Sequence, residues 1–288
     1  MAKKRILVAA IAGLAGLLVT LRRRGDGART VKEDWPVNVA HRGASARAPE
    51  NTLEAFREAV EAGAGGLELD VHMTLDGEIV VIHDPTVDRT TNGSGDVAQM
   101  TLEEIRALDA GYRFSPDGGS TYPYRGAGLR VPRLAEVYEE FPDVPVNIEI
   151  KRAQPGVEEA VLEVIRGAAG RTLVASNRHE VVRRFRRISG GSISTAASRR
   201  EIGRFYVLSR LRLERLYSPA YDALQVPPEH RGMKVVTPRL LEAAHDRGVR
   251  VDVWTINEPG EMRRMLDLGA DGVMTDRPEE LVRVLAER

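Results

Sequence analysis

Acidic side chains recur at a spacing of two residues in apolar runs of this chain. Glu68 and Asp70 lie in the run 66–72, where the two-residue period of an extended strand points both carboxylates to one side. Glu149 lies in a second alternating run and shares its face with Lys151. Oxygen ligands that converge on one point suit Mg²⁺ or Ca²⁺ and argue against zinc. The spacing therefore predicts a divalent metal site formed by Glu68, Asp70 and Glu149.

Two histidines stand at the ends of other predicted strands. His41 follows the extended run 37–40, and His83 ends the run 79–84. Imidazoles beside a metal site can take a proton from one oxygen and give one to another. Arg42 follows His41, and its planar guanidinium can bind two phosphate oxygens at once. This collection predicts cleavage of a phosphodiester, with His41 and His83 as the catalytic residues.

Seven short runs, in this order and spacing, resemble the glycerophosphodiester phosphodiesterase family. The resemblance extends over about residues 37–281. The matching runs are HRG at 41–43, PENT at 49–52, ELDV at 68–71, HDPT at 83–86 together with DRTTNG at 88–93, IEIK at 148–151, VWTIN at 253–257 and TDRP at 275–278. One departure is Ala175-Ser176-Asn177, which stands where relatives usually carry a Ser-Phe pair.

The resemblance implies further roles in substrate binding. Lys151 would face the phosphate, Trp254 would contact the glycerol backbone, and Glu50 would line the site. The implied reaction is metal-dependent hydrolysis of a glycerophosphodiester to an alcohol and glycerol 3-phosphate, by attack of the substrate's own glycerol hydroxyl. From the residues alone, Glu50 and Asn51 could instead cap a helix, Trp254 could pack in the core, and Thr275-Asp276 could cap the last helix.

Length and alternation predict an α/β fold, a TIM (β/α)8 barrel over residues 37–288. Nine apolar runs begin near 37, 66, 79, 146, 172, 192, 223, 250 and 271, and helical patterns such as 52–62 and 259–268 lie between them. A (β/α)8 barrel has eight strands, so one of the nine runs does not belong to its wall. The run in question is the one at 66, 79 or 192. The turn-rich stretch 88–130 predicts an insertion, which we interpret as a lid facing the substrate.

Residues 1–36 predict a membrane anchor and a linker. Residues 6–21 carry no charge and are flanked by three basic residues on each side. As a helix this segment would be roughly 24 Å long against a hydrocarbon core of about 30 Å, and snorkelling Lys and Arg can make up the difference. A cleaved signal peptide is the alternative, but arginines follow Leu21 directly where a small-residue cleavage site is expected. The flanking charges assign no side of the membrane.

The net charge of zero conceals two unlike parts. Residues 1–36 hold eight basic and three acidic residues, which leaves 34 basic and 39 acidic residues in the remainder. An acidic catalytic part argues against nucleic acid as a partner, and basic flanks suit anionic lipid head groups. The absence of cysteine excludes disulfides and thiolate metal sites. No protein partner or oligomeric state follows from the sequence.

Three alternative functions remain at this point. The anchor could serve a lysophospholipase D activity on membrane lysophospholipids. The domain could be a non-catalytic, membrane-anchored binding module that keeps the barrel. A different phosphate-binding barrel enzyme would require a Schiff-base lysine or a glycine-rich phosphate loop late in the chain, and neither is evident.

Overall fold

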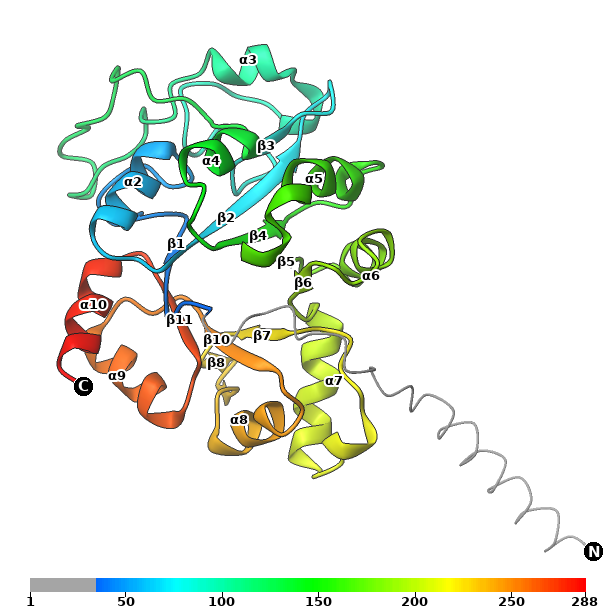
Figure 1. The fold of residues 1–288 in the computed structure, drawn as a ribbon. Coiled ribbons are helices and arrows are strands. Elements are labelled where there is room, and N and C mark those ends of the chain that lie inside the picture. Colours follow the sequence, from blue (N-terminus) through cyan, green and yellow to red (C-terminus); the bar gives the residue numbers. More distant parts are fainter. Residues whose placement is uncertain (1–34) are drawn as a thin grey trace, which may run out of the picture.

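The computed structural model describes residues 35–288, which form a nearly closed barrel of parallel strands inside a ring of helices (Figure 1). The predicted membrane segment at 6–21 lies outside the described residues. The wall strands are β1 (Asn38–His41), β2 (Gly66–Met73), β4 (Val146–Ile150), β5 (Thr172–Ala175), β6 (Ser194–Thr195), β7 (Ala223–Val226), β10 (Arg250–Val253) and β11 (Gly272–Thr275). Their order around the wall is β6, β5, β4, β2, β1, β11, β10, β7, and a parallel bridge between Ala196 and Ala223 joins its two ends. The predicted TIM barrel is confirmed.

The helices cover the outside of this wall (Figure 1). They are α2 (Leu53–Glu61), α4 (Leu134–Glu140), α5 (Val157–Ile165), α6 (His179–Ile188), α7 (Arg199–Arg210), α8 (Pro238–His245), α9 (Pro259–Leu268) and α10 (Pro278–Ala286). The side chain of Thr52 caps α2 by accepting from the Ala55 amide, and Pro259 begins α9, where its missing N–H has no helical partner to lose. Among residues 35–288, no helix is long and apolar enough to cross a membrane.

The surplus strand of the sequence prediction is β3 (Ile79–Val81). It pairs antiparallel with the outer half of β2, with Val71 opposite Val81, and so is not part of the parallel wall. The short turn around Asp76 and Gly77 requires this arrangement, because a tight hairpin can only join antiparallel strands. Gly77 has a φ of 88°, a conformation that favours glycine. The run at 192 therefore supplies the eighth wall strand, β6.

The insertion at 88–130 forms its own small layer beside β3. It contains η1 (Val97–Gln99) and α3 (Leu102–Arg106), and Thr101 and Glu104 form a capping box at the start of α3. Apolar side chains of the insertion join those flanking β3 in a separate cluster made of Val80, Ile82, Val87, Val97, Ile105, Ala110 and Val131. The insertion thus shares a small hydrophobic core, separate from the barrel core, with β3 and the residues that flank it.

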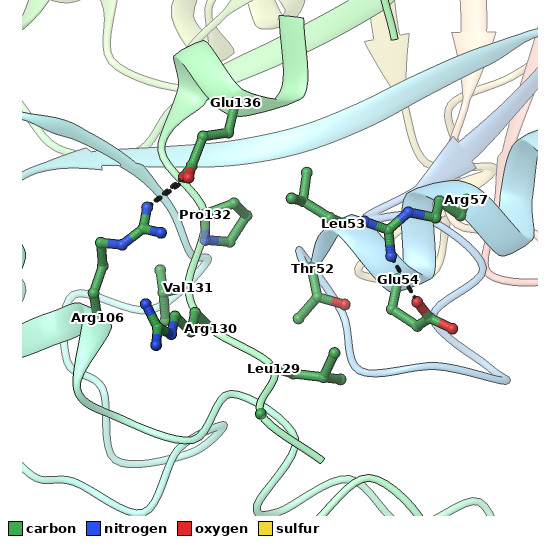
Figure 2. Close-up of a pocket in the computed structure, with 11 residues that line it drawn as sticks. Thr52, Leu53, Glu54, Arg57, Arg106, Leu129, Arg130, Val131, Pro132 and Glu136 are labelled. Atoms are coloured by element: carbon green, nitrogen blue, oxygen red, sulfur yellow. Dashed lines mark hydrogen bonds and ion pairs between the residues drawn. The ribbon is translucent and has the colours of Figure 1, made fainter. Parts of the chain in front are cut away.

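Figure 2 shows the cleft where this layer meets α2 and α4. Arg106 of α3 pairs with Glu136 of α4, with 2.6 Å between Nη1 and Oε1. The hydroxyl of Tyr124 donates to Glu58 of α2 at 2.8 Å. These contacts attach the insertion to the outer surface of the helices, and none of the predicted site residues lines this cleft.

Candidate active site

The carboxyl ends of β1, β2 and β4 bring the predicted acidic and imidazole residues together. The strand register places His41 beside Glu68, and Asp70 beside Glu149. One carboxylate oxygen from each of the three acidic residues lies within 4.8 Å of the other two. Glu68 and Asp70 are buried, with 4% and 1% of their surface exposed. Adjacent parallel strands therefore assemble one oxygen cluster from residues 81 positions apart in the chain.

The cluster has the donor chemistry of a hard divalent cation site. Three carboxylates supply oxygen ligands, which suit Mg²⁺ or Ca²⁺. The ammonium of Lys151 lies 2.9 Å from Glu149 Oε2 and 3.3 Å from Asp70 Oδ1, so it neutralises part of their charge. Burial raises the pKa of Glu68 to about 8, and the charges of Asp70 and Glu149 add to that shift. The folded chain thus holds a carboxyl that is mostly neutral at pH 7, and a further positive charge beside it would favour its ionised form.

Arg42 lies beside these carboxylates on a strained turn. Its φ is 59°, and the next residue, Gly43, packs so closely on Ala55 that a Cβ would lie 2.6 Å from the Ala55 carbonyl carbon. This turn directs the Arg42 amide to Glu68 Oε2 at 3.1 Å. The guanidinium approaches Glu50 at 3.0 Å and Asp70 at 3.1 Å. The predicted phosphate-binding residues Arg42 and Glu50 are therefore in direct contact.

His41 is oriented by a carboxylate from the other end of the chain. Its Nδ1 lies 2.7 Å from Asp276 Oδ1, which also accepts from Ser45, while Asp276 Oδ2 accepts from Asn257 at 2.6 Å. Burial alone would lower the pKa of His41, but the hydrogen bond to Asp276 and the charge of Glu68 outweigh it and raise the pKa. The role of Asp276 was missed from sequence, where it was read as a helix cap, although its position at the end of the last strand could have indicated it.

His83 has an equivalent partner next to it in the chain. Its Nδ1 lies 2.6 Å from Asp84 Oδ1. Arg89, from the insertion, donates to Asp84 at 2.6 Å and to both oxygens of Glu50 at 2.7 and 2.8 Å. Burial favours the neutral form of Asp84, but hydrogen bonds from Arg89 and His83 prevail and lower its pKa to about 2. The insertion therefore supports His83 through Arg89, a contact that sequence reasoning did not anticipate.

Two asparagines also hold the cluster in place. Asn51 is buried with a φ of 58°, and its side chain donates to Asp70 Oδ2 at 3.0 Å. The helix cap is Thr52 instead, so the capping alternative for Asn51 is wrong. Asn177, at the departure from the family pattern, donates to Glu149 Oε1 at 2.7 Å. Both amides bind carboxylates of the cluster through contacts that the local sequence does not reveal.

An open pocket lies above the cluster at the carboxyl end of the barrel. Trp254 is 38% exposed and lines this pocket, so it is not packed in the core. The pocket is lined by His41, Arg42, Glu68, His83, Glu149, Lys151, Ala175, Asn177, Ala197, Ile202, Gln225, Trp254 and Met274. None of the residues 88–130 is among them, although Arg89 of the insertion contacts Glu50 and Asp84 beside this pocket. The interpretation of the insertion as a lid stays a prediction.

A parallel barrel with three converging carboxylates, two carboxylate-paired histidines and two adjacent cations defines a phosphodiester-cleaving barrel enzyme. The model of the glycerophosphoryl diester phosphodiesterase family matches residues 41–280, and the chain belongs to this family. A glycerophosphodiester phosphodiesterase from Caldanaerobacter subterraneus subsp. tengcongensis is 39% identical over 256 residues, which cover 86% of this chain and 96% of the relative.

More distant comparisons agree on the fold and widen the range of named activities. The crystal structure of a glycerophosphodiester phosphodiesterase from Agrobacterium tumefaciens has a TM-score of 0.68 and 28% identity, covering 85% of this chain and 98% of that one. Lysophospholipase D GDPD1 of Rattus norvegicus is 27% identical over 271 residues, covering 85% of this chain and 84% of the relative. The chain is thus an enzyme of the glycerophosphoryl diester phosphodiesterase family, and its 39% identical relative is named for the cleavage of glycerophosphodiesters.

Proposed function

We propose that the barrel hydrolyses soluble glycerophosphodiesters at the pocket above Glu68, Asp70 and Glu149, with Mg²⁺ or Ca²⁺ held by these three residues. The convergence of their oxygens within 4.8 Å carries this proposal. When bound there, the cation would polarise the phosphoryl group and lower the pKa of a coordinated hydroxyl. Arg42 and Lys151 border the same pocket and supply positive charge for the phosphate.

The two histidines divide the proton transfers. The raised pKa of His41 favours its charged form, so we assign it as the acid that protonates the leaving alcohol oxygen. His83, with its Nδ1 engaged by Asp84, takes the proton from the attacking hydroxyl through its other ring nitrogen. Attack by the substrate's glycerol hydroxyl would give a cyclic phosphate, which water then opens to glycerol 3-phosphate.

The experiment is a phosphodiesterase assay of the purified protein on glycerophosphocholine and glycerophosphoethanolamine, with and without a chelator. We expect turnover with Mg²⁺ or Ca²⁺ and its loss after chelation. Glu149→Gln preserves the size of the side chain but removes one ligand charge, so it should abolish activity while the protein stays folded by circular dichroism. Full turnover by this variant, or by cation-free protein, would refute the metal assignment.

Lysophospholipid hydrolysis is the second candidate, because a relative carries the name lysophospholipase D. We favour the soluble diester, since Arg42, Lys151 and the carboxylates recognise atoms of the head group and phosphate. If residues 6–21 anchored the enzyme, it would meet lysophospholipids in the bilayer at a higher effective concentration than a free enzyme would. Faster turnover of lysophosphatidylcholine than of glycerophosphocholine by the full chain would reverse this preference.

A further inference from the structure

A basic and apolar surface lies on α7 and the two segments that pack beside it, η3 (Glu214–Leu216) and the hairpin of β8 (Glu229–His230) and β9 (Met233–Lys234). Of the ten large hydrophobic residues that are exposed within residues 35–288, five belong to this region. They are Val207, Leu211, Leu213, Leu216 and Met233. The hydroxyl of Tyr206 on α7 donates to the Lys234 carbonyl at 3.3 Å, which ties the hairpin to the helix. We call these five residues and the cations among them the basic apolar patch.

The cations of the basic apolar patch have no carboxylate partners. Arg210, Arg212, Arg215 and Lys234 are exposed, and no carboxylate oxygen of residues 35–288 lies within 4.0 Å of their charged nitrogens. The acidic Glu214 is buried and forms its ion pair with Arg239 of α8, although the charge of the adjacent Arg215 also helps to lower its pKa. The basic apolar patch therefore combines exposed leucine side chains with arginine side chains that form no ion pair within residues 35–288.

The charge of this segment is opposite to that of the rest of the catalytic part. Residues 199–234 hold eight basic and four acidic residues, whereas the remainder of 37–288 holds 26 basic and 35 acidic. Leu211 and Leu216 are 61% and 68% exposed. A cluster of such exposed apolar side chains usually marks a surface that binds a partner or a membrane. Leucine interspersed with arginine is the composition of surfaces that lie in the interface of an anionic bilayer, where apolar groups enter the acyl boundary and cations meet lipid phosphates.

We propose that the basic apolar patch is a docking surface for an anionic phospholipid bilayer, separate from the N-terminal segment. Charge complementarity selects this occupant over a neutral apolar partner. The position of the patch also relates it to the pocket, because Ile202 on the first half of the same helix lines the pocket mouth. Docking through α7 would bring that mouth close to the lipid surface.

Vesicle co-sedimentation of residues 35–288 tests the proposal without the predicted anchor. This part is expected to fold alone, because the core clusters of the barrel consist of its own residues and the match with the solved Agrobacterium enzyme covers 98% of that chain. Vesicles contain phosphatidylcholine alone or mixed with phosphatidylglycerol. We expect binding to the mixed vesicles, weak binding to the neutral ones, and release by high salt.

Two patch variants and two matched controls separate the contributions. Leu211→Ser with Leu216→Ser removes the apolar part, and Arg210→Gln with Arg212→Gln and Arg215→Gln removes the charge. Each should weaken binding to mixed vesicles at least tenfold and leave turnover of glycerophosphocholine unchanged. Leu75→Ser, at a site 60% exposed elsewhere, and Arg183→Gln with Arg187→Gln, on the exposed side of α6, should bind like wild type.

Three outcomes would overturn the proposal. Wild-type protein that does not bind mixed vesicles would refute it, as would patch variants that bind as well as the controls. The third is a dimer in sedimentation velocity that the serine variant converts to monomer, which would assign the surface to a second copy of the chain. Turnover of glycerophosphocholine is measured for every variant. If it is retained, a failed binding test counts against the docking surface and not against the proposed catalytic function.

Discussion

Cation binding at the proposed site should depend on pH through Glu68, because a divalent cation would bind there only after this carboxyl ionises. Burial among Asp70 and Glu149 raises the Glu68 pKa to about 8 from an ordinary value of 4.5. This difference corresponds to about 5 kcal/mol in favour of the neutral carboxyl in the folded, cation-free protein. Half of Glu68 is then ionised near pH 8 and about 1% at pH 6, so cation affinity should be about 50-fold weaker at pH 6.

The sign of the stability effect follows from the same shift. A raised pKa in the folded state contributes stability that is complete below pH 4.5 and is lost as the pH rises through 8. Cation-free wild type should therefore lose about 2 kcal/mol of unfolding free energy between pH 6 and pH 8, relative to Glu68→Gln. Saturating cation should reverse this trend, because it binds the ionised form.

Isothermal titration of Mg²⁺ and Ca²⁺ at pH 6, 7 and 8, in buffers of different ionisation enthalpy, measures both affinity and proton release. We expect close to one proton released per cation at pH 6 and about half a proton at pH 8. Glu163→Gln, an exposed carboxylate on α5, is the matched control and should behave like wild type. Affinity that does not change with pH, or binding without proton release, would refute the reasoning.

Further predictions concern the histidines, their supports and the N-terminal segment. His41→Ala and His83→Ala should each lower kcat roughly 10²- to 10⁴-fold, about 3 to 5 kcal/mol, and a variant within a few-fold of wild type would make that histidine structural. Asp276→Asn should lower the His41 pKa and move the alkaline limb of the kcat/KM profile to lower pH; an unmoved limb contradicts the assignment of His41 as the acid. Arg89→Met should reduce kcat about tenfold with little change in KM, since it loosens Asp84 behind His83, whereas equal loss in an Arg183→Met control would indicate a general effect. Deleting residues 1–34 should spare kcat/KM for glycerophosphocholine, and a selective loss of lysolipid turnover on vesicles would favour the lysophospholipase D alternative.

The carboxylate cluster and the fold class were accessible from local pattern. The two-residue period of a strand places Glu68 and Asp70 on one face of β2, and this does not depend on how the strand packs in the fold. Alternation of apolar strands and helices indicates a parallel barrel, and the carboxyl ends of its strands meet at one rim. The assembly of Glu149 with that pair follows from the parallel pairing of β2 and β4.

The strand count and the insertion were harder to interpret. A run of three apolar residues has the same sequence pattern in a barrel wall and in a hairpin. Only its antiparallel pairing with β2 distinguishes β3 from a wall strand. The aromatic insertion suggested a lid because turn-rich loops often cover sites. The hydroxyl of Tyr124 bonds to Glu58 of α2, and Arg89 bonds to Asp84 beside His83. Neither contact tests the lid, which stays a prediction.

The sequence by itself determined which side chains could bind a cation and on which face of a strand they lie, because that depends on residues two positions apart. Tertiary structure decided how those groups are held and charged. The Asp276 partner of His41 lies 235 residues away and reaches it because β11 closes the barrel against β1. The pKa of Glu68 likewise depends on burial and on charges from neighbouring strands, which exist only after the wall has formed.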